Sequence, residues 1–172
     1  IVFASSIQAE IDNPYGKSKK NAEEILINLS NEHDVNIYLF RLPNVFGKWS
    51  KPNYNSVVAT FCYNISRELP IRIDDKNKIL ELVYIDDVIK KFAELVNGTK
   101  KELKKNFFEE IIPKYKISVE DLAKQLYAFQ KIKNTGVIEN VGTGLTRALY
   151  ATYISYLPKE KFSYPIISKK DF

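Results

Sequence analysis

The chain has 172 residues, of which 45% are hydrophobic and 27% are charged. This balance is that of an ordinary globular protein and excludes disorder as the main state, while the length suits one domain rather than two. The 26 basic and 21 acidic residues leave a net charge of +5, which we attribute to a lysine-rich surface rather than to nucleic-acid binding.

Features that the sequence lacks restrict the class of protein further. No apolar run approaches the roughly 20 residues that a membrane span requires, and no basic and apolar leader opens the chain. The single cysteine, Cys62, excludes a disulfide framework and a cysteine-built zinc site. We therefore expect a cytoplasmic protein without a membrane partner and without a metal. Methionine is absent and the first residue is Ile1, so we also expect a piece of a longer protein.

The first forty residues predict a βαβ unit. Residues 1–4 form a short apolar run that is typical of a buried parallel strand. A turn is expected at residues 12–14, a helix over residues 15–32, and a second parallel strand over residues 35–40. The helix spacing places four residues on one apolar face: Ala22, Ile25, Leu26 and Leu29.

The rest of the chain predicts shorter strands and further helices. Prolines, a glycine and asparagines predict a loop over residues 41–55. Strands are expected over residues 71–73 and 82–85, and helices over residues 56–69, 86–96, 118–131 and 147–157. The connections expected are a charged segment over residues 100–105, a glycine-containing loop over residues 135–146 and a linker over residues 159–172.

Tyr15 and Lys19 form the first candidate for chemistry. They are four residues apart at the start of the first predicted helix, so they share one helix face. A lysine ammonium beside a phenol favours the phenolate by charge attraction, which lets the pair act as an acid or a base. Tyr127 and Lys131 have the same spacing, so spacing alone does not identify a site. Tyr15, however, follows a strand that ends in two serines, and ligands of open α/β sheets bind at the carboxyl ends of strands.

Three ordered segments resemble the active site of the extended short-chain dehydrogenase/reductase family. Ser5 and Ser6, followed by residues 13–19 with Glu23 in the same helix, are similar to its Ser…Tyr-x-x-x-Lys pattern. Two later segments resemble its Arg-x-x-Asn-x-x-Gly and Tyr-Val-x-Asp-Val elements, residues 41–47 and 83–88. Longer segments resemble the reductases of this family that act in capsular-polysaccharide synthesis, residues 46–62, 150–158 and 162–165.

The resemblance implies an α/β fold. Residues 1–158 would be the C-terminal part of a Rossmann-type domain together with its small substrate-binding lobe, without the N-terminal glycine-rich half. Residues 159–172 would be a linker toward a cupin domain that the sequence does not contain. The family's Gly-x-x-Gly-x-x-Gly turn, which holds the cofactor pyrophosphate, is absent from the sequence. The resemblance therefore also implies that these 172 residues alone are inactive.

The same resemblance implies a reaction and its partners. The reaction would be reduction of the C4 ketone of a UDP-4-keto-6-deoxy-N-acetylhexosamine, with NADP(H) as cofactor and NAD(H) as the alternative. The protein would bind a UDP-sugar, work as a homodimer in the cytoplasm and bind neither nucleic acid nor a membrane. Two other interpretations stay open, namely another sugar-nucleotide epimerase or dehydratase of the family and a catalytically silent fragment.

The resemblance also assigns roles to individual residues. Ser6, Tyr15 and Lys19 would be catalytic. Tyr15 and Lys19 would also contact the cofactor, together with Leu42, Asn44 and Val45. Substrate contacts would come from Asn44, Asn53 and Ser56. No metal ligand is implied.

Several positions depart from the family's pattern or favour a structural role. Leu80 stands where many members have an arginine, so the pyrophosphate would be held by Lys48 or Lys51. Trp49 and the tyrosines of the last predicted helix are expected to pack rather than to stack on substrate. The two acidic residues Asp86–Asp87 are expected to start a helix rather than to form a catalytic carboxylate pair.

Overall fold

The computed structural model describes residues 1–33, 35–98 and 107–162, which form two compact units. The first unit takes residues 1–45 and 80–116, and the second takes the remaining residues. The charged segment predicted over residues 100–105 lies outside the described residues. In the described part of the chain, no helix is both long and apolar enough to cross a membrane.

A βαβ unit opens the first unit, as predicted. Strand β1 (Val2–Ser6) and strand β2 (Tyr38–Leu42) are parallel, and helix α1 (Pro14–Glu32) connects them. Strand β2 begins and ends later than the predicted range 35–40. The reason is its pairing, because the register with β1 runs from Val2 opposite Tyr38 to Ser6 opposite Leu42. Leu39 of β2 also forms a parallel bridge with Phe108.

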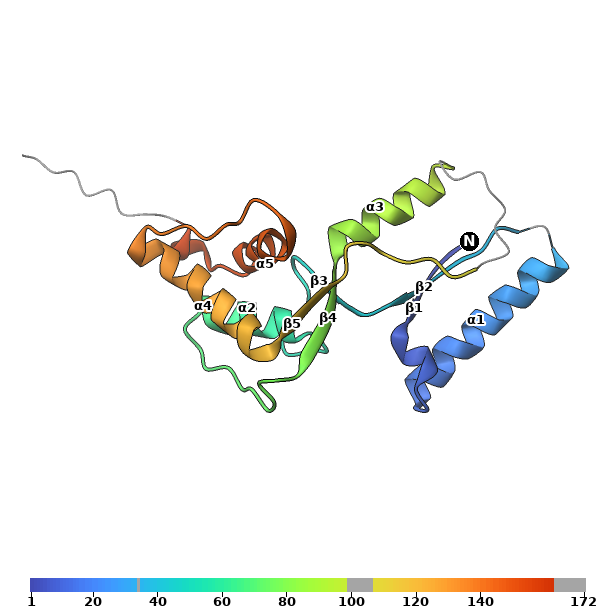
Figure 1. Cartoon of the computed structure of the whole chain (residues 1–172), viewed down its shortest axis with the longest axis horizontal. Helices are drawn as coiled ribbons and strands as arrows, with labels where there is room; N and C mark the ends of the chain where they lie inside the picture. The colour runs from blue at the N-terminus through green and yellow to red at the C-terminus, as the bar shows by residue number, and fades with distance from the viewer. Residues whose placement is uncertain (34, 99–106, 163–172) are drawn as a thin grey trace, which may run out of the picture. The chain divides into compact units, whose positions relative to one another are not determined.

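The strand pair lies between two helices of the same unit. Figure 1 shows β1 and β2 with α1 along one side and α3 (Ile85–Val96) along the other. The Phe40 and Phe92 rings are 4.9 Å apart between their centroids, which joins β2 to α3. This α/β layering confirms the predicted fold class. The buried core cluster of the unit comprises Phe40, Val83, Val88, Leu95 and Ile111.

Helix α1 begins where its sequence predicts, but only part of its predicted apolar face is shielded: Ala22, Leu26 and Leu29 are half-buried. Asn13 Oδ1 accepts the Gly16 backbone N–H at 2.7 Å, and a proline occupies the first helical position. The predicted apolar face is wrong at Ile25, which is 67% exposed. The buried residues of α1 are Gly16 and Glu23. Glu23 can be buried because its carboxylate accepts hydrogen bonds from Ser5 of β1 and Arg41 of β2.

A second sheet has the order β3–β4–β5, with β3 at Asn44–Phe46, β4 at Ile79–Tyr84 and β5 at Tyr115–Ser118. The expected loop over residues 41–55 is therefore wrong at its start, because residues 44–46 pair with β4. The expected strand over residues 71–73 is also wrong, since those residues form no strand and are mostly exposed. Alternation of apolar residues alone does not reveal which segments find a partner.

Three helices make up most of the second unit. They are α2 (Val57–Ser66), α4 (Val119–Thr135) and α5 (Gly144–Ile154), and a short 3-10 helix spans Lys159–Lys161. Each of the three helices contacts the other two. Their shared core contains buried aliphatic and aromatic side chains, among them Phe61, Ile65, Leu122, Leu126, Phe129, Leu149 and Tyr153. The tyrosines Tyr153 and Tyr156 are buried, in agreement with the expected packing role.

Helix α4 offers a test of the second unit's stability. Ser118 Oγ accepts the Asp121 backbone N–H at 3.0 Å and satisfies a helix-start donor. We expect Ser118→Ala to lower the free energy of unfolding by about 1 kcal/mol, measured by urea denaturation. Asn28→Ala, at an exposed position within α1, is the control and should change it by no more than about 0.5 kcal/mol. Equal effects of the two changes would contradict the capping role.

Candidate active site

Ser6 lies at the carboxyl end of the parallel strand pair. It is the last residue of β1 and pairs in register with Leu42, the last residue of β2. Its Oγ accepts the Gln8 backbone N–H at 3.2 Å and so starts a short 3-10 helix (Ile7–Glu10). A hydroxyl that accepts one hydrogen bond still has its proton to donate, so Ser6 can act as a donor to a ligand at this edge.

The structure brings Tyr15 and Lys19 together near the same strand. Lys19 Nζ is 5.7 Å from the centroid of the Tyr15 ring and 5.1 Å from that of Phe3. It also donates to the Ala4 carbonyl oxygen at 3.1 Å. An ammonium group has three donors, so Lys19 retains donors for the hydroxyl groups of a cofactor ribose. Tyr15 is 51% exposed, which leaves it accessible to a ligand.

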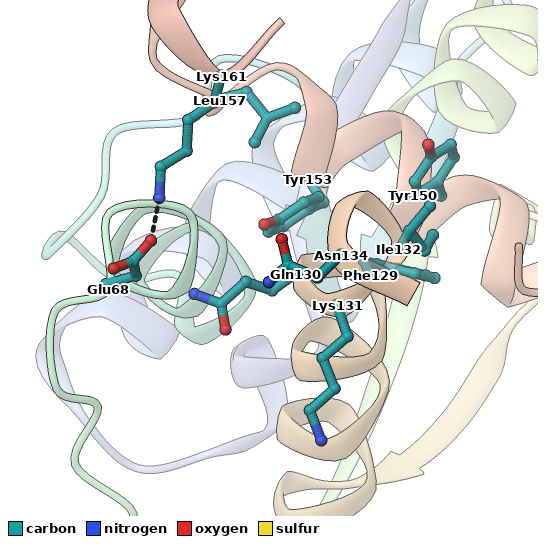
Figure 2. A pocket seen from close by; sticks show the side chains of 10 residues that line it. All are labelled: Glu68, Phe129, Gln130, Lys131, Ile132, Asn134, Tyr150, Tyr153, Leu157 and Lys161. Atoms are coloured by element: carbon teal, nitrogen blue, oxygen red, sulfur yellow. Dashed lines mark hydrogen bonds and ion pairs between the residues drawn. The ribbon is translucent and has the colours of Figure 1, made fainter. Parts of the chain in front are cut away.

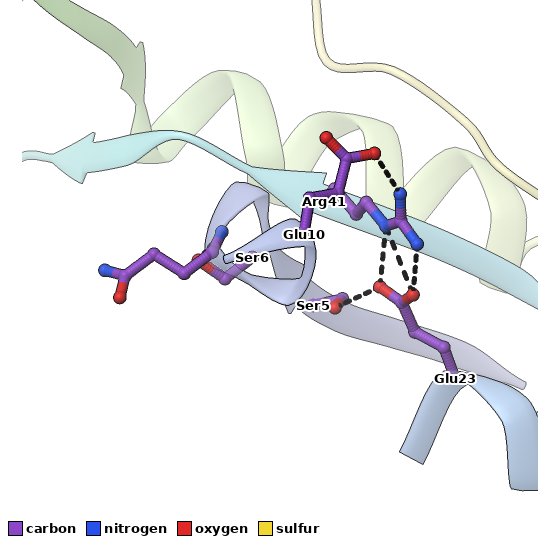
Figure 3. Close-up of polar contacts among 6 residues, drawn as sticks. Ser5, Ser6, Glu10, Glu23 and Arg41 are labelled. Carbon is purple, nitrogen blue, oxygen red and sulfur yellow. Dashed lines mark hydrogen bonds and ion pairs between the residues drawn. The ribbon is translucent and has the colours of Figure 1, made fainter. Parts of the chain in front are cut away.

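Behind this strand end lies a polar network that the sequence interpretation missed. Glu23 is 2% exposed, and its carboxylate accepts hydrogen bonds from Arg41 Nε at 3.0 and 3.1 Å and from Arg41 Nη2 at 2.7 Å. It also accepts the Ser5 hydroxyl (Figure 3). Arg41 Nη1 donates to Glu10 at 2.6 Å. A signal was present in the sequence, because Glu23 follows Lys19 by one further helical turn on the same face.

Charge and burial act in opposite directions on this network. Burial raises the pKa of Glu23, but the hydrogen bonds from Arg41 and Ser5 and the charge of Arg41 lower it more, so the pKa lies below its ordinary value. The hydrogen bond with Glu23 raises the pKa of Arg41 despite burial. Both groups are therefore ionised at neutral pH, and the pair is a salt bridge with its hydrogen bonds satisfied.

The residues that follow β2 begin the second sheet. Asn44 is exposed, and its Nδ2 donates to the Glu81 carbonyl oxygen at 3.2 Å. Asn44 and the half-buried Val45 belong to β3 rather than to a loop. The amide oxygen of Asn44 is an acceptor that can contact a ligand. Leu80, the residue in place of the family's arginine, is buried in β4 and has no charge to offer a pyrophosphate.

Asn53 and Ser56 belong to the second unit, and both have local structural partners. The Asn53 backbone has φ +55° and donates its N–H to Thr60 Oγ1 at 2.9 Å. Ser56 Oγ accepts the Ala59 backbone N–H at 3.2 Å and so caps α2. These contacts explain the two residue types without a substrate, so their substrate role stays a prediction.

The segment of residues 48–54 carries two exposed aromatic rings, Trp49 and Tyr54. Trp49 is 80% exposed with φ +61°, so the expectation that it packs is wrong. Lys48 Nζ lies 5.9 Å from its ring centroid, and Lys51 Nζ lies 5.4 Å from that of Tyr54. Such contacts are weak at exposed positions. The lysines proposed for the pyrophosphate are thus surface residues next to aromatic rings.

The second unit also contains a cavity of about 550 Å³ between α4, α5 and the end of α2. Figure 2 shows Phe129 and Gln130 from α4 facing it together with Tyr150 and Tyr153 from α5. Lys161 donates to Glu68 at 2.5 Å on its rim. The residues that line this cavity include none of the predicted site residues. Among the described residues, no group of three or more His, Cys, Asp or Glu side chains could hold a metal.

Comparison with known proteins extends these observations. A model of the NAD dependent epimerase/dehydratase family matches residues 4–107. A UDP-2-acetamido-2,6-beta-L-arabino-hexul-4-ose reductase from Pseudomonas aeruginosa is 49% identical over 171 residues, which are 99% of this chain and 45% of that protein. The crystal structure of capsular polysaccharide assembling protein CapF from Staphylococcus aureus is 39% identical, with a TM-score of 0.88, and the match covers 96% of this chain and 45% of that chain.

A more distant solved structure shares the fold alone. UDP-glucose 4-epimerase from Thermotoga maritima, solved with UDP-glucose, is 20% identical with a TM-score of 0.70. The match covers 94% of this chain and 64% of that chain. This chain therefore spans less than half the length of the reductase and of CapF, and under two thirds of the epimerase.

Proposed function

Because the chain belongs to the NAD dependent epimerase/dehydratase family, we propose that it supplies the catalytic residues for reduction of a 4-keto UDP-sugar. The substrate would be a UDP-4-keto-6-deoxy-N-acetylhexosamine used for surface polysaccharide. The observation that carries the proposal is the Lys19 ammonium beside the Tyr15 ring, next to the end of β1. The 49% identity to a hexul-4-ose reductase supports the choice of reduction over the family's other reactions.

A nicotinamide cofactor, when bound, supplies the hydride that adds to C4. The Tyr15 phenol then donates its proton to the oxygen on C4, so that the ketone becomes a hydroxyl group. Tyr15 regains a proton from solvent. Ser6 donates a hydrogen bond to the same oxygen, which stabilises the negative charge that develops on it. Lys19 favours the phenolate that remains by charge attraction.

The residues present fit a nicotinamide nucleotide. Lys19 has donors left for the ribose hydroxyl groups after its bond to Ala4. The backbone of Leu42, Asn44 and Val45 would lie along the nicotinamide, because Leu42 ends β2 opposite Ser6 and the other two residues follow it. We propose NADP(H) rather than NAD(H) as the natural cofactor. The 172 residues contain no Gly-x-x-Gly-x-x-Gly turn, so this chain alone should bind the cofactor weakly and be inactive.

The substrate contacts form the second part of the proposal. Asn44 would accept a hydrogen bond from the sugar nucleotide through its amide oxygen, and Asn53 and Ser56 would also contact the substrate. The homodimer and the cytoplasmic location implied by the resemblance, with no nucleic acid or membrane as partner, belong to the same proposal.

Cofactor consumption distinguishes reduction from its alternatives. We expect the natural protein, mixed with a 4-keto UDP-sugar, to oxidise one NADPH for each sugar reduced and to use NADH more slowly, followed by cofactor absorbance. An epimerase or dehydratase of the family returns its cofactor unchanged, so it would show conversion of the sugar without net consumption. A silent protein would show neither. Either of these results would contradict the proposed reduction.

A further inference from the structure

A buried carboxylate lies on the same face of α1 as the proposed catalytic pair. Tyr15, Lys19 and Glu23 are spaced by four residues, so they follow one another along one helix face. Lys19 Nζ donates to the Ala4 carbonyl oxygen, and Glu23 accepts the hydroxyl of the next strand residue, Ser5. Successive turns of the helix are thus tied to successive residues of β1.

The same carboxylate reaches the second strand. Arg41 lies opposite Ser5 in the register of β1 and β2, and it holds both oxygens of Glu23 (Figure 3). Its guanidinium lies 4.5 Å from the centroid of the Phe108 ring, the residue whose backbone segment bridges β2. One carboxylate therefore joins α1, β1 and β2.

Stability alone does not account for this arrangement. Removing a carboxylate and a guanidinium from water is costly, and an apolar replacement of such a pair is often neutral or stabilising. Hydrogen bonds between charged groups, in contrast, fix distances and angles, whereas apolar contacts are non-directional. A buried salt bridge with several directed bonds therefore defines a position more sharply than a packed aliphatic contact would.

We propose that Glu23 is a positioning residue that fixes the position of α1 along the axis of β1, so that the distances from Tyr15 and Lys19 to Ser6 stay constant. The inference rests on the proposed function, because it concerns the geometry of that reaction. Neighbouring strand residues point to opposite faces, so fixing Ser5 on the Glu23 side also fixes the direction of the Ser6 hydroxyl. Misplacement of a reacting group by about 1 Å can lower a rate by about 10²-fold.

The decisive variant removes the network without leaving any buried partner unpaired, because the exposed Glu10 can be hydrated when Arg41 is removed. In the natural protein, Ser5→Ala, Glu23→Met and Arg41→Met together replace all three bonded groups by apolar side chains. We expect the thermal midpoint to stay within about 5 °C of the wild type, because no charge is left buried. We expect kcat to fall at least about tenfold while KM changes less than about threefold, because only the alignment of the reacting groups is lost.

A matched control uses the other carboxylate of the same arginine. Glu10 also accepts a hydrogen bond from Arg41. Its side chain, however, is 71% exposed, and the hydrogen bond to Ser5 of β1 is made by Glu23. Glu10→Gln should leave kcat within about twofold of the wild type. Glu23→Gln should lower kcat like the triple variant, with a lower thermal midpoint because the Arg41 charge loses its buried partner.

Three results would overturn the inference. A folded triple variant with wild-type kcat would show that the network serves stability only. A triple variant that does not fold would show that the fold itself requires the network. An inactive wild-type protein would contradict the proposed function and this inference together. The first two results, obtained beside an active wild type, would contradict the inference alone.

Discussion

Replacing Tyr15 by phenylalanine in the natural protein is expected to lower turnover by about 10²-fold or more, because a positioned acid contributes about 10²–10⁴-fold to such a step. The change removes one hydroxyl group and keeps the ring near Lys19. Tyr15 is half exposed, so the fold should lose little stability. Substrate KM should change much less than kcat, since the proton is transferred only in the transition state.

The chain contains its own control for this experiment. Tyr127 and Lys131 have the same four-residue spacing, but they lie on α4 in the second unit. Tyr127→Phe also removes one hydroxyl group from a partly exposed tyrosine, and we expect it to leave turnover unchanged. Near-normal turnover of Tyr15→Phe, or an equal loss in the two variants, would remove Tyr15 from the proposed role.

Gly16→Ala is expected to have the largest effect on the fold. Gly16 lies in the first turn of α1, and a Cβ atom there would be 2.2 Å from the Gln8 carbonyl oxygen and 2.4 Å from that of Ile11. Both obstacles are backbone atoms, which a rotamer change cannot move. We expect a loss of about 3 kcal/mol in the free energy of unfolding. We also expect a fall in kcat, because the helix start that carries Tyr15 must shift.

Gly142→Ala provides the comparison for Gly16. Its nearest neighbour to an added Cβ is Asn140 Oδ1 at 3.8 Å, an ordinary contact. Urea denaturation of the two variants should show a change of no more than about 0.5 kcal/mol for Gly142→Ala. If both variants unfolded at the same urea concentration as the wild type, this result would contradict the close approach of the Gln8 and Ile11 carbonyl oxygens to Gly16.

The helix starts were predictable because their signals are local. Asn13 stands before Pro14 and Ser118 stands before two acidic residues, patterns that are typical of helix starts, and in both cases the side chain accepts a backbone N–H. Asp86 and Asp87 likewise fall in the first turn of α3. The α/β class was predictable from the βαβ pattern, and the family was indicated by the resemblance of three ordered segments to its motifs, residues 5–19, 41–47 and 83–88.

The buried side of α1 could not be predicted from periodicity. Counting apolar residues selected a face with Ile25, which is exposed, because the count assumes that a glutamate lies in water. Glu23 is buried because Arg41, eighteen residues later, arrives beside it on β2. For the same reason β3 could not be predicted, because its partner β4 lies more than thirty residues away in the sequence. Pairing over such distances leaves no local signal in the sequence.

The loop of Trp49 shows a different limit. An isolated tryptophan is usually part of a core, so packing was the reasonable expectation. The backbone at Trp49 is left-handed, and its N–H donates to Ser155 Oγ at 3.4 Å, which leaves the ring outside. Backbone conformation at a single residue is set by the contacts of the whole loop, and a tryptophan, unlike a glycine or an asparagine, does not indicate a left-handed conformation in advance.

Isotope transfer tests the central claim most directly. The natural protein is mixed with the 4-keto UDP-sugar and NADPH that carries deuterium at its transferable position, and the product is analysed by mass spectrometry and NMR. We predict one deuterium at C4 for each NADPH oxidised, with the rate falling about 10²-fold or more in Tyr15→Phe and not in Tyr127→Phe. A converted sugar without deuterium at C4, or a rate that Tyr15→Phe leaves unchanged, would contradict the assignment of this chain as the reducing site.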